Sequence, residues 1–170
     1  KDYIPTINIS SLLNKNFNSI TSNNTIKKIE KACVEVGFFQ ITNHGINKKN
    51  INDIVKVGKY FFNSSIKNKL KLAPKKWNNL NKNTYRGYFS ADVNGKEGLD
   101  IGDLKVTKKY ALKLKNPYIE YLDLNKAISK KSINILNNYF DQIYLLGEIL
   151  FKSIIKLYKK NIKDSKLAFS

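Results

Sequence analysis

The sequence predicts an α+β fold in which helices alternate with short strands. Apolar residues recur at helical spacing in three stretches, over residues 26–36, 51–62 and 136–158. Short runs of β-branched and aromatic residues bounded by Gly, Pro or Asn occur between these stretches. At 170 residues, 42% of them hydrophobic, the chain can bury a sizeable core. Because these elements cannot bury their own apolar faces, we expect a layer that packs around another core.

The first strand and helix are predicted from local patterns. Residues 3–9 alternate loosely behind Pro5, which favours a short edge strand. Asn24 is placed to cap a helix and Gly37 to end it. The apolar face of this helix comprises Ile26, Ile29, Ala32, Cys33 and Val36. We expect that face to pack on a core.

A second strand and helix follow. Residues 38–42 are typical of a short buried strand, and the sequence Asn43-His44-Gly45 suits a tight turn after it. A helix is predicted over 48–63, followed by a short helical piece over 64–70 that Ser64 and Ser65 can cap.

The rest of the chain predicts a loop, a hairpin and a long helix. Pro74 and a cluster of asparagines indicate a loop over 73–83, and residues 85–89 and 99–106 suit two short strands around the turn Asn94-Gly95. Residues 129–160 form the longest periodic segment. As a continuous helix it would span roughly 45 Å and would need a large partner surface.

The charge is strongly basic but has little arginine. The net charge is +18, and of the 31 basic residues only Arg86 is an arginine. Clustered cations would favour nucleic acid, yet arginine is the preferred residue for bidentate recognition of bases and phosphates. With 23 Asn residues beside the lysines, a biased composition explains the basicity without a polyanionic partner. We therefore expect no specific nucleic acid.

Few residues suit catalysis or metal binding. His44 is the single histidine, has no carboxylate two residues on, and is expected to be a turn imidazole bonded to backbone. Cys33 is expected to be a small buried hydrophobe. Glu97, Asp100 and Asp103 lack a histidine partner and are expected to be solvated or paired with lysines. We therefore expect no catalytic, cofactor-binding or metal-binding residue within these 170.

Several separated segments carry a family resemblance. They are Ile4-Pro5-Thr6-Ile7-Asn8-Ile9-Ser10, Gly37-Phe38-Phe39-Gln40-Ile41-Thr42-Asn43-His44-Gly45-Ile46, Arg86-Gly87-Tyr88-Phe89, Lys96-Glu97-Gly98-Leu99-Asp100-Ile101-Gly102 and Asn116-Pro117. In this order they resemble the N-terminal region of the isopenicillin N synthase-like (plant-type) iron(II)/2-oxoglutarate-dependent oxygenases. The resemblance covers residues 4 to about 160, roughly the N-terminal half of a typical member.

The resemblance implies a fold and a set of cofactors. Residues 1–170 would be the N-terminal region, ending in the long helix at about 129–160 and packing around a jelly-roll (double-stranded β-helix) core. That catalytic jelly-roll domain is expected downstream and would be a partner for the apolar face over 136–158. Members bind iron(II) through a 2-His-1-carboxylate triad and use 2-oxoglutarate. The parent protein would hydroxylate, desaturate or cyclise a small organic substrate, and these 170 residues alone would be inactive.

Arg86 and Tyr88 are the expected substrate-binding residues. Strand alternation would place both side chains on one face of a strand. In the family that the chain resembles, the matching stretch lines the mouth of the active site, where an arginine can meet a substrate carboxylate. The alternative is that Arg86 pairs with Glu97 or Asp100 across the hairpin.

Two other functions remain open. The chain could be a basic, non-enzymatic nucleic-acid-binding module, or a catalytically dead family member that serves as a scaffold. No stretch approaches the length of a membrane span, and a lone cysteine gives no sign of an oxidising compartment, so we expect a cytoplasmic protein with no membrane partner.

Overall fold

The computed structural model describes a mostly helical α+β chain with short strands. It forms two compact units, one made of residues 1–48 and 141–170 and the other of residues 49–140. The described residues are 4–13, 19–74, 86–107, 109 and 121–157.

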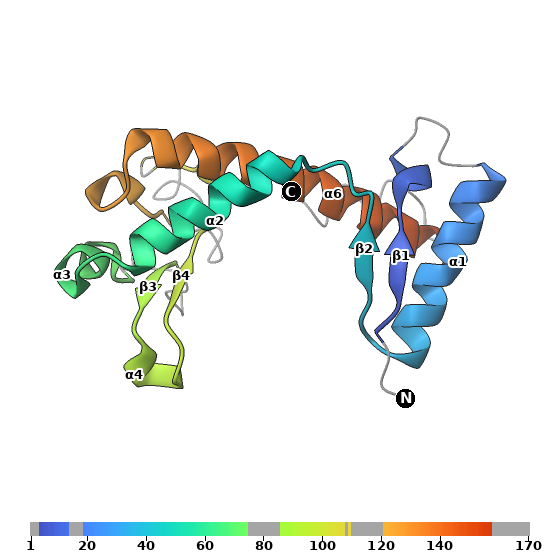
Figure 1. Cartoon of the computed structure of the whole chain (residues 1–170), viewed down its shortest axis with the longest axis horizontal. Helices are drawn as coiled ribbons and strands as arrows, with labels where there is room; N and C mark the ends of the chain where they lie inside the picture. The colour runs from blue at the N-terminus through green and yellow to red at the C-terminus, as the bar shows by residue number, and fades with distance from the viewer. Residues whose placement is uncertain (1–3, 14–18, 75–85, 108, 110–120, 158–170) are drawn as a thin grey trace. The chain divides into compact units, whose positions relative to one another are not determined.

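The first unit is built on a small parallel sheet. Strand β1 (Thr6–Asn8) pairs in parallel with β2 (Gln40–Thr42), with Ile7 opposite Ile41. Helix α1 (Ile20–Glu35) lies beside β1, as Figure 1 shows. The expected edge strand and its successor are thus confirmed over three residues each. The first core joins β1, the residues that follow it, α1 and the C-terminal helix, and its buried members are Ile7, Ile9, Leu12, Ile26, Ile29, Ala32 and Leu146.

Helix α1 begins earlier than its sequence suggested. Its N-cap is Ser19, whose hydroxyl oxygen accepts a hydrogen bond from the Ser22 backbone N–H at 3.1 Å, and Asn24 lies inside the helix. The predicted end is confirmed, because Gly37 adopts a φ of 82° and donates its N–H to the Ala32 carbonyl. The cap was misplaced because Ile20, the apolar residue of the first turn, is exposed and starts no apolar period.

Two expectations about burial in this unit are wrong. Cys33 is exposed, although it follows the buried Ile26 and Ile29 by seven and four residues and so lies on the same face of α1. It belongs to the last turn of the helix, where Ala32 is the last buried residue. The strand over 38–42 is also not buried. Phe38 is 71% exposed, and in β2 only Ile41 is partly covered.

Helix α6 (Lys130–Leu157) confirms the long predicted helix. Its apolar residues already have partners among the described residues: Ile133 and Leu136 pack against the core of the second unit, and Ile149, Leu150 and Ile154 against the first core. The apolar face predicted over 136–158 is therefore largely covered by described residues. What remains exposed is a short segment comprising Ile143, Tyr144 and Leu145, which are 41%, 37% and 58% exposed.

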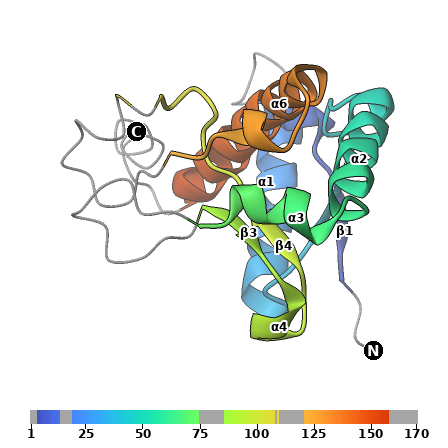
Figure 2. The ribbon, with the colours of Figure 1, turned by 90° about the vertical axis from the view of Figure 1, so that its left-hand side faces the viewer.

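The second unit combines helices with an antiparallel hairpin. Helix α2 (Lys48–Phe62) is followed by α3 (Ile66–Lys69) and the 3₁₀ helix η2 (Leu70–Leu72), as predicted, and Ser65 caps α3. Strands β3 (Gly87–Phe89) and β4 (Gly98–Asp100) form the hairpin, with α4 (Ala91–Asn94) at its tip (Figure 2). A further 3₁₀ helix, η3 (Leu124–Lys126), precedes α6.

The predicted hairpin is confirmed with shorter strands. Pairing ends at Asp100, so residues 101–106 are not strand, and Tyr85 lies outside the described residues, as does most of the predicted loop over 73–83. Gly87 has a φ of 130°, and a Cβ there would lie 2.6 Å from the Leu72 carbonyl oxygen. This close approach brings β3 onto the end of η2. The second core lies at this junction, with Phe61, Leu72, Tyr88, Leu124 and Ile128 buried.

Candidate functional site

Tyr88 lies inside the second core. It is 2% exposed, and its ring meets Phe61 edge-on with ring centroids 6.0 Å apart. Its hydroxyl donates a hydrogen bond to Glu97 Oε1 at 2.6 Å. That bond, together with burial and the negative charge of Glu97, raises the pKa of Tyr88 to about 12. The phenol is therefore neutral and is held across the hairpin by a carboxylate.

Lys69 completes this cluster from the end of α3. Its ammonium lies 2.5 Å from Glu97 Oε1, donates to the Phe62 carbonyl at 3.1 Å, and is 5.6 Å from the centroid of the Tyr88 ring. Hydrogen bonds from Lys69 and then from Tyr88 hold the pKa of the Glu97 carboxyl below its ordinary value. The cluster links the ends of α2 and α3 to the hairpin.

Arg86 comes directly before β3 and lies beside the continuation of the opposite strand. The guanidinium rests on Gly102, two residues beyond β4, where a Cβ would be 2.6 Å from Nε and 2.7 Å from Cζ. Within the described part of the chain, no carboxylate forms an ion pair with Arg86. Neither alternative pairing, with Glu97 or with Asp100, is present among the described residues, and Glu97 is bound to Lys69 and Tyr88 instead.

The structure therefore separates the two residues predicted for substrate binding. Tyr88 turns its hydroxyl to Glu97 inside the unit, whereas Arg86 lies half-buried at the edge of the hairpin. Binding of substrate by either stays a prediction. No pattern in the sequence indicated Lys69 as the partner of Glu97, since the two are 28 residues apart. Nor did any pattern indicate that Gly102 lies under the arginine.

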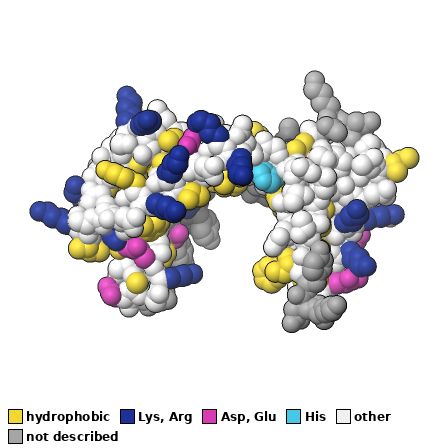
Figure 3. Space-filling view, in the orientation of Figure 1, with side chains coloured by type: hydrophobic (Ala, Val, Ile, Leu, Met, Phe, Trp, Pro, Cys, Tyr) yellow, Lys and Arg dark blue, Asp and Glu magenta, His cyan; other side chains and the backbone are white. Residues whose placement is uncertain are grey.

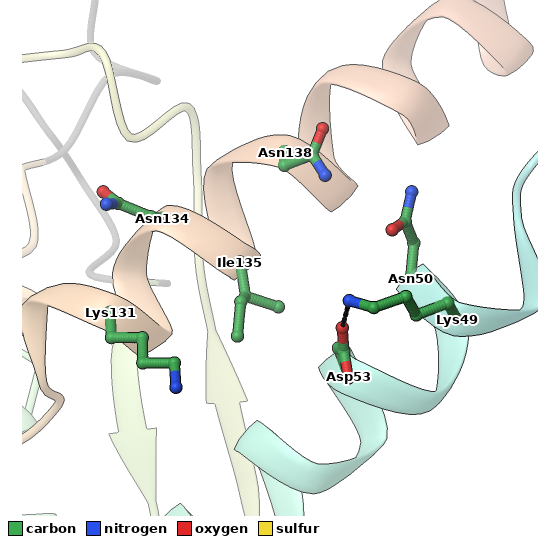
Figure 4. Close-up of a pocket in the computed structure, with 7 residues that line it drawn as sticks. All are labelled: Lys49, Asn50, Asp53, Lys131, Asn134, Ile135 and Asn138. Atoms are coloured by element: carbon green, nitrogen blue, oxygen red, sulfur yellow. Dashed lines mark hydrogen bonds and ion pairs between the residues drawn. The ribbon is translucent and has the colours of Figure 1, made fainter.

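A groove between α2 and α6 is the second feature of this unit. It has a volume of about 350 Å³ and is lined by Lys49, Asn50, Asp53, Lys131, Asn134, Ile135 and Asn138 (Figure 4). Lys49 and Asp53 form an ion pair at 2.7 Å on its α2 side. That hydrogen bond, with the charges of Lys49, Lys56 and Lys131, lowers the pKa of the Asp53 carboxyl. The groove is thus cationic, with a single carboxylate already paired.

His44 belongs to a turn, as expected. Its Nδ1 accepts a hydrogen bond from the Ile46 backbone N–H at 3.2 Å, and the flanking Asn43 and Gly45 have positive φ values of 53° and 80°. Among the described residues, no three His, Cys, Asp or Glu side chains gather into a possible metal site. The described residues of this chain therefore do not fit the iron triad.

Lysines lie over both units in the view of Figure 3. None of the described helices is long and apolar enough to cross a membrane.

Comparison with known proteins decides the family. Residues 4–131 match the family model described as non-haem dioxygenase in morphine synthesis, N-terminal. The chain belongs to this family. It is the N-terminal region found in the isopenicillin N synthase-like iron(II)/2-oxoglutarate dioxygenases, as the motifs over 4–10 and 37–46 suggested.

Relatives of this dioxygenase N-terminal region are longer proteins. A probable iron/ascorbate oxidoreductase of Dictyostelium discoideum is 35% identical over 112 residues, covering 59% of this chain and 29% of that protein. Isopenicillin N synthase of Streptomyces griseus is 32% identical over 98 residues, with coverages of 58% and 28%. The apo crystal structure of a C-terminally truncated Neurospora crassa protein superposes with a TM-score of 0.65 at 22% identity, covering 89% of this chain and 51% of that one. The chain thus spans under a third of these two sequence relatives and about half of this structure.

Proposed function

We propose that this chain is the N-terminal part of an iron(II)/2-oxoglutarate-dependent oxygenase that hydroxylates, desaturates or cyclises a small organic substrate. The observation that carries the proposal is the family match over residues 4–131. Relatives named isopenicillin N synthase and 2-oxoglutarate-dependent dioxygenase tropC, the latter from Talaromyces stipitatus, support the reaction class.

In this proposal iron(II) and 2-oxoglutarate are bound by a jelly-roll core outside these residues. The only histidine, His44, has its Nδ1 engaged in a turn, so the ligands of an iron triad must come from elsewhere in the protein. The exposed apolar segment of α6, comprising Ile143, Tyr144 and Leu145, is proposed to pack against that core.

Arg86 is proposed to bind a carboxylate of the substrate. Its guanidinium has no ion-pair partner among the described residues, and guanidinium groups hydrogen-bond carboxylates through two parallel N–H donors. The proposed contribution of Tyr88 is indirect, because Glu97 occupies its hydroxyl. The Tyr88 ring anchors β3 in the second core and so holds the residue that precedes it.

The test uses the protein encoded by the complete reading frame. With iron(II), ascorbate and 2-oxoglutarate, we expect conversion of 2-oxoglutarate to succinate, stimulated by carboxylate-bearing members of a small-molecule panel. Arg86→Gln should weaken binding of the stimulating compound by about tenfold or more while the uncoupled conversion persists, and Arg86→Lys should be milder. Absence of any iron-dependent succinate formation would refute the oxygenase proposal. Unchanged binding in both variants would refute the role of Arg86 alone.

A further inference from the structure

The contact between Arg86 and Gly102 has a definite orientation. A Cβ at residue 102 would lie 2.6 Å from Nε, 2.7 Å from Cζ and 3.0 Å from Nη2. A point in front of the N–H edge of a guanidinium is farther from Cζ than from both nitrogens of that edge. Here Cζ is nearer than Nη2. The face of the guanidinium therefore lies over Gly102, and its N–H edges point along other directions.

Steric space, rather than backbone conformation, is the reason that residue 102 is glycine. Gly102 is not among the glycines with positive φ, so an L-residue could adopt its backbone angles. Any Cβ, however, would occupy the space that the guanidinium fills. Gly87 differs, because there the collision is with the Leu72 carbonyl and the φ is 130°.

We propose that Gly102 is a positioning residue that seats the face of the Arg86 guanidinium and leaves its N–H edges directed at an anionic ligand. The inference rests on the proposed role of Arg86 and specifies its geometry. A planar guanidinium held by one face can offer two parallel N–H donors to a carboxylate without first losing side-chain freedom. The Glu97 carboxylate of the hairpin is already paired with Lys69.

Substitution of Gly102 by Ala gives a selective perturbation. The atoms that a methyl group would meet belong to the far end of a flexible side chain, so the guanidinium moves and the backbone stays. The matched control is Gly98→Ala in the same hairpin. Its Cβ would collide with the Phe89 ring and not with Arg86. Any effect common to both variants reports on the hairpin, and an effect of Gly102→Ala alone reports on the contact between residue 102 and the Arg86 guanidinium.

The test exploits the fact that Arg86 is the single arginine of these 170 residues. In a ¹⁵N-labelled sample of the chain, one arginine Nε–H signal is expected, and its heteronuclear NOE measures how firmly the guanidinium is held. We expect a positive value close to that of the backbone in the original chain and in Gly98→Ala, and a strongly reduced value in Gly102→Ala. A reduced NOE in the original chain, or an unchanged NOE in Gly102→Ala, would overturn the proposal that Gly102 holds the Arg86 guanidinium in place.

A second measurement separates this inference from the proposed function. In the complete protein, Gly102→Ala should raise the KM for the stimulating substrate by about tenfold, the effect of losing one charge-assisted hydrogen bond. Gly98→Ala should leave that KM within about twofold of the original. An unchanged KM in Gly102→Ala would overturn the positioning role. A protein without any 2-oxoglutarate turnover would refute the proposed function. The NOE measurement on the chain would still decide whether Gly102 holds the Arg86 guanidinium in place.

Discussion

The second core should depend strongly on Leu72. This residue is 1% exposed in η2, against the strand that carries Tyr88. Replacing it with Ala removes three buried carbon groups, which at about 0.8 kcal/mol each gives about 2.4 kcal/mol of lost transfer free energy. The unfilled cavity adds to this, so we expect Leu72→Ala to lower the free energy of unfolding by about 3 kcal/mol.

The matched control lies two residues away. Leu70 is in the same 3₁₀ helix but is 53% exposed, so Leu70→Ala should change the free energy of unfolding by no more than about 0.5 kcal/mol. Both variants are compared with the original chain by urea unfolding followed by circular dichroism, with the denaturant slope checked for constancy. Equal effects of the two substitutions would refute the packing described for this core.

Three further outcomes are expected. Tyr88 should ionise with a pKa of about 12 in a site-resolved NMR titration, and Glu97→Gln should move that pKa back toward the ordinary tyrosine value of about 10. Because the pKa is raised in the folded state, the contribution of Tyr88 to the free energy of unfolding is complete below about pH 10 and is lost as the pH rises through about 12. An unmoved pKa in Glu97→Gln would contradict Glu97 as the cause of the shift. Ser19→Ala should lower the free energy of unfolding by about 1 kcal/mol in thermal unfolding, because Ser19 caps α1. Asn24→Ala, at the position that the sequence favoured as the cap, should cost less than half as much. A larger loss for Asn24→Ala than for Ser19→Ala would contradict Ser19 as the cap. Binding of the chain to DNA in a gel-shift series should be weak and should fall steeply as salt rises, and binding that persists at physiological salt would favour the nucleic-acid module.

Local signals in the sequence predicted most of the secondary structure. The apolar periods of α1, α2 and α6 located three helices, and Gly37, Ser65 and the Asn94-Gly95 turn marked where elements end or reverse. The cap at Ser19 was missed because Ile20, the apolar residue in the first turn of α1, does not belong to the apolar period that starts at Ile26. Such signals lie within a few residues of the feature they describe, so they can be read from the chain alone.

The candidate site depended on contacts that local patterns do not encode. Alternation predicted that Arg86 and Tyr88 would share a face, but it could not show that Glu97 takes the Tyr88 hydroxyl. Nor could it show that Lys69, at the end of α3, pairs with the same carboxylate. The contact of Arg86 with Gly102 arises from the strand register, which places the residue before β3 beside the continuation of β4.

The family motifs extended the prediction beyond these contacts. Separated motifs in the family's order, among them residues 4–10 and 37–46, identified the dioxygenase N-terminal region, and the family match over 4–131 confirmed it. These motifs did not predict how buried each residue would be. Cys33, for example, lies outside the core that its helical spacing suggested.

Iron binding tests the central claim most directly. We propose an anaerobic iron(II) titration of the 170-residue chain and of the protein from the complete reading frame, with a lysine-rich protein of similar charge as the reference. The complete protein should bind iron(II) stoichiometrically, and the chain alone should bind no more than the reference, because a triad requires two histidines and this chain has one. Tight stoichiometric binding by the chain alone, or no binding by the complete protein, would contradict the assignment of this chain as the N-terminal region of an iron(II)/2-oxoglutarate oxygenase.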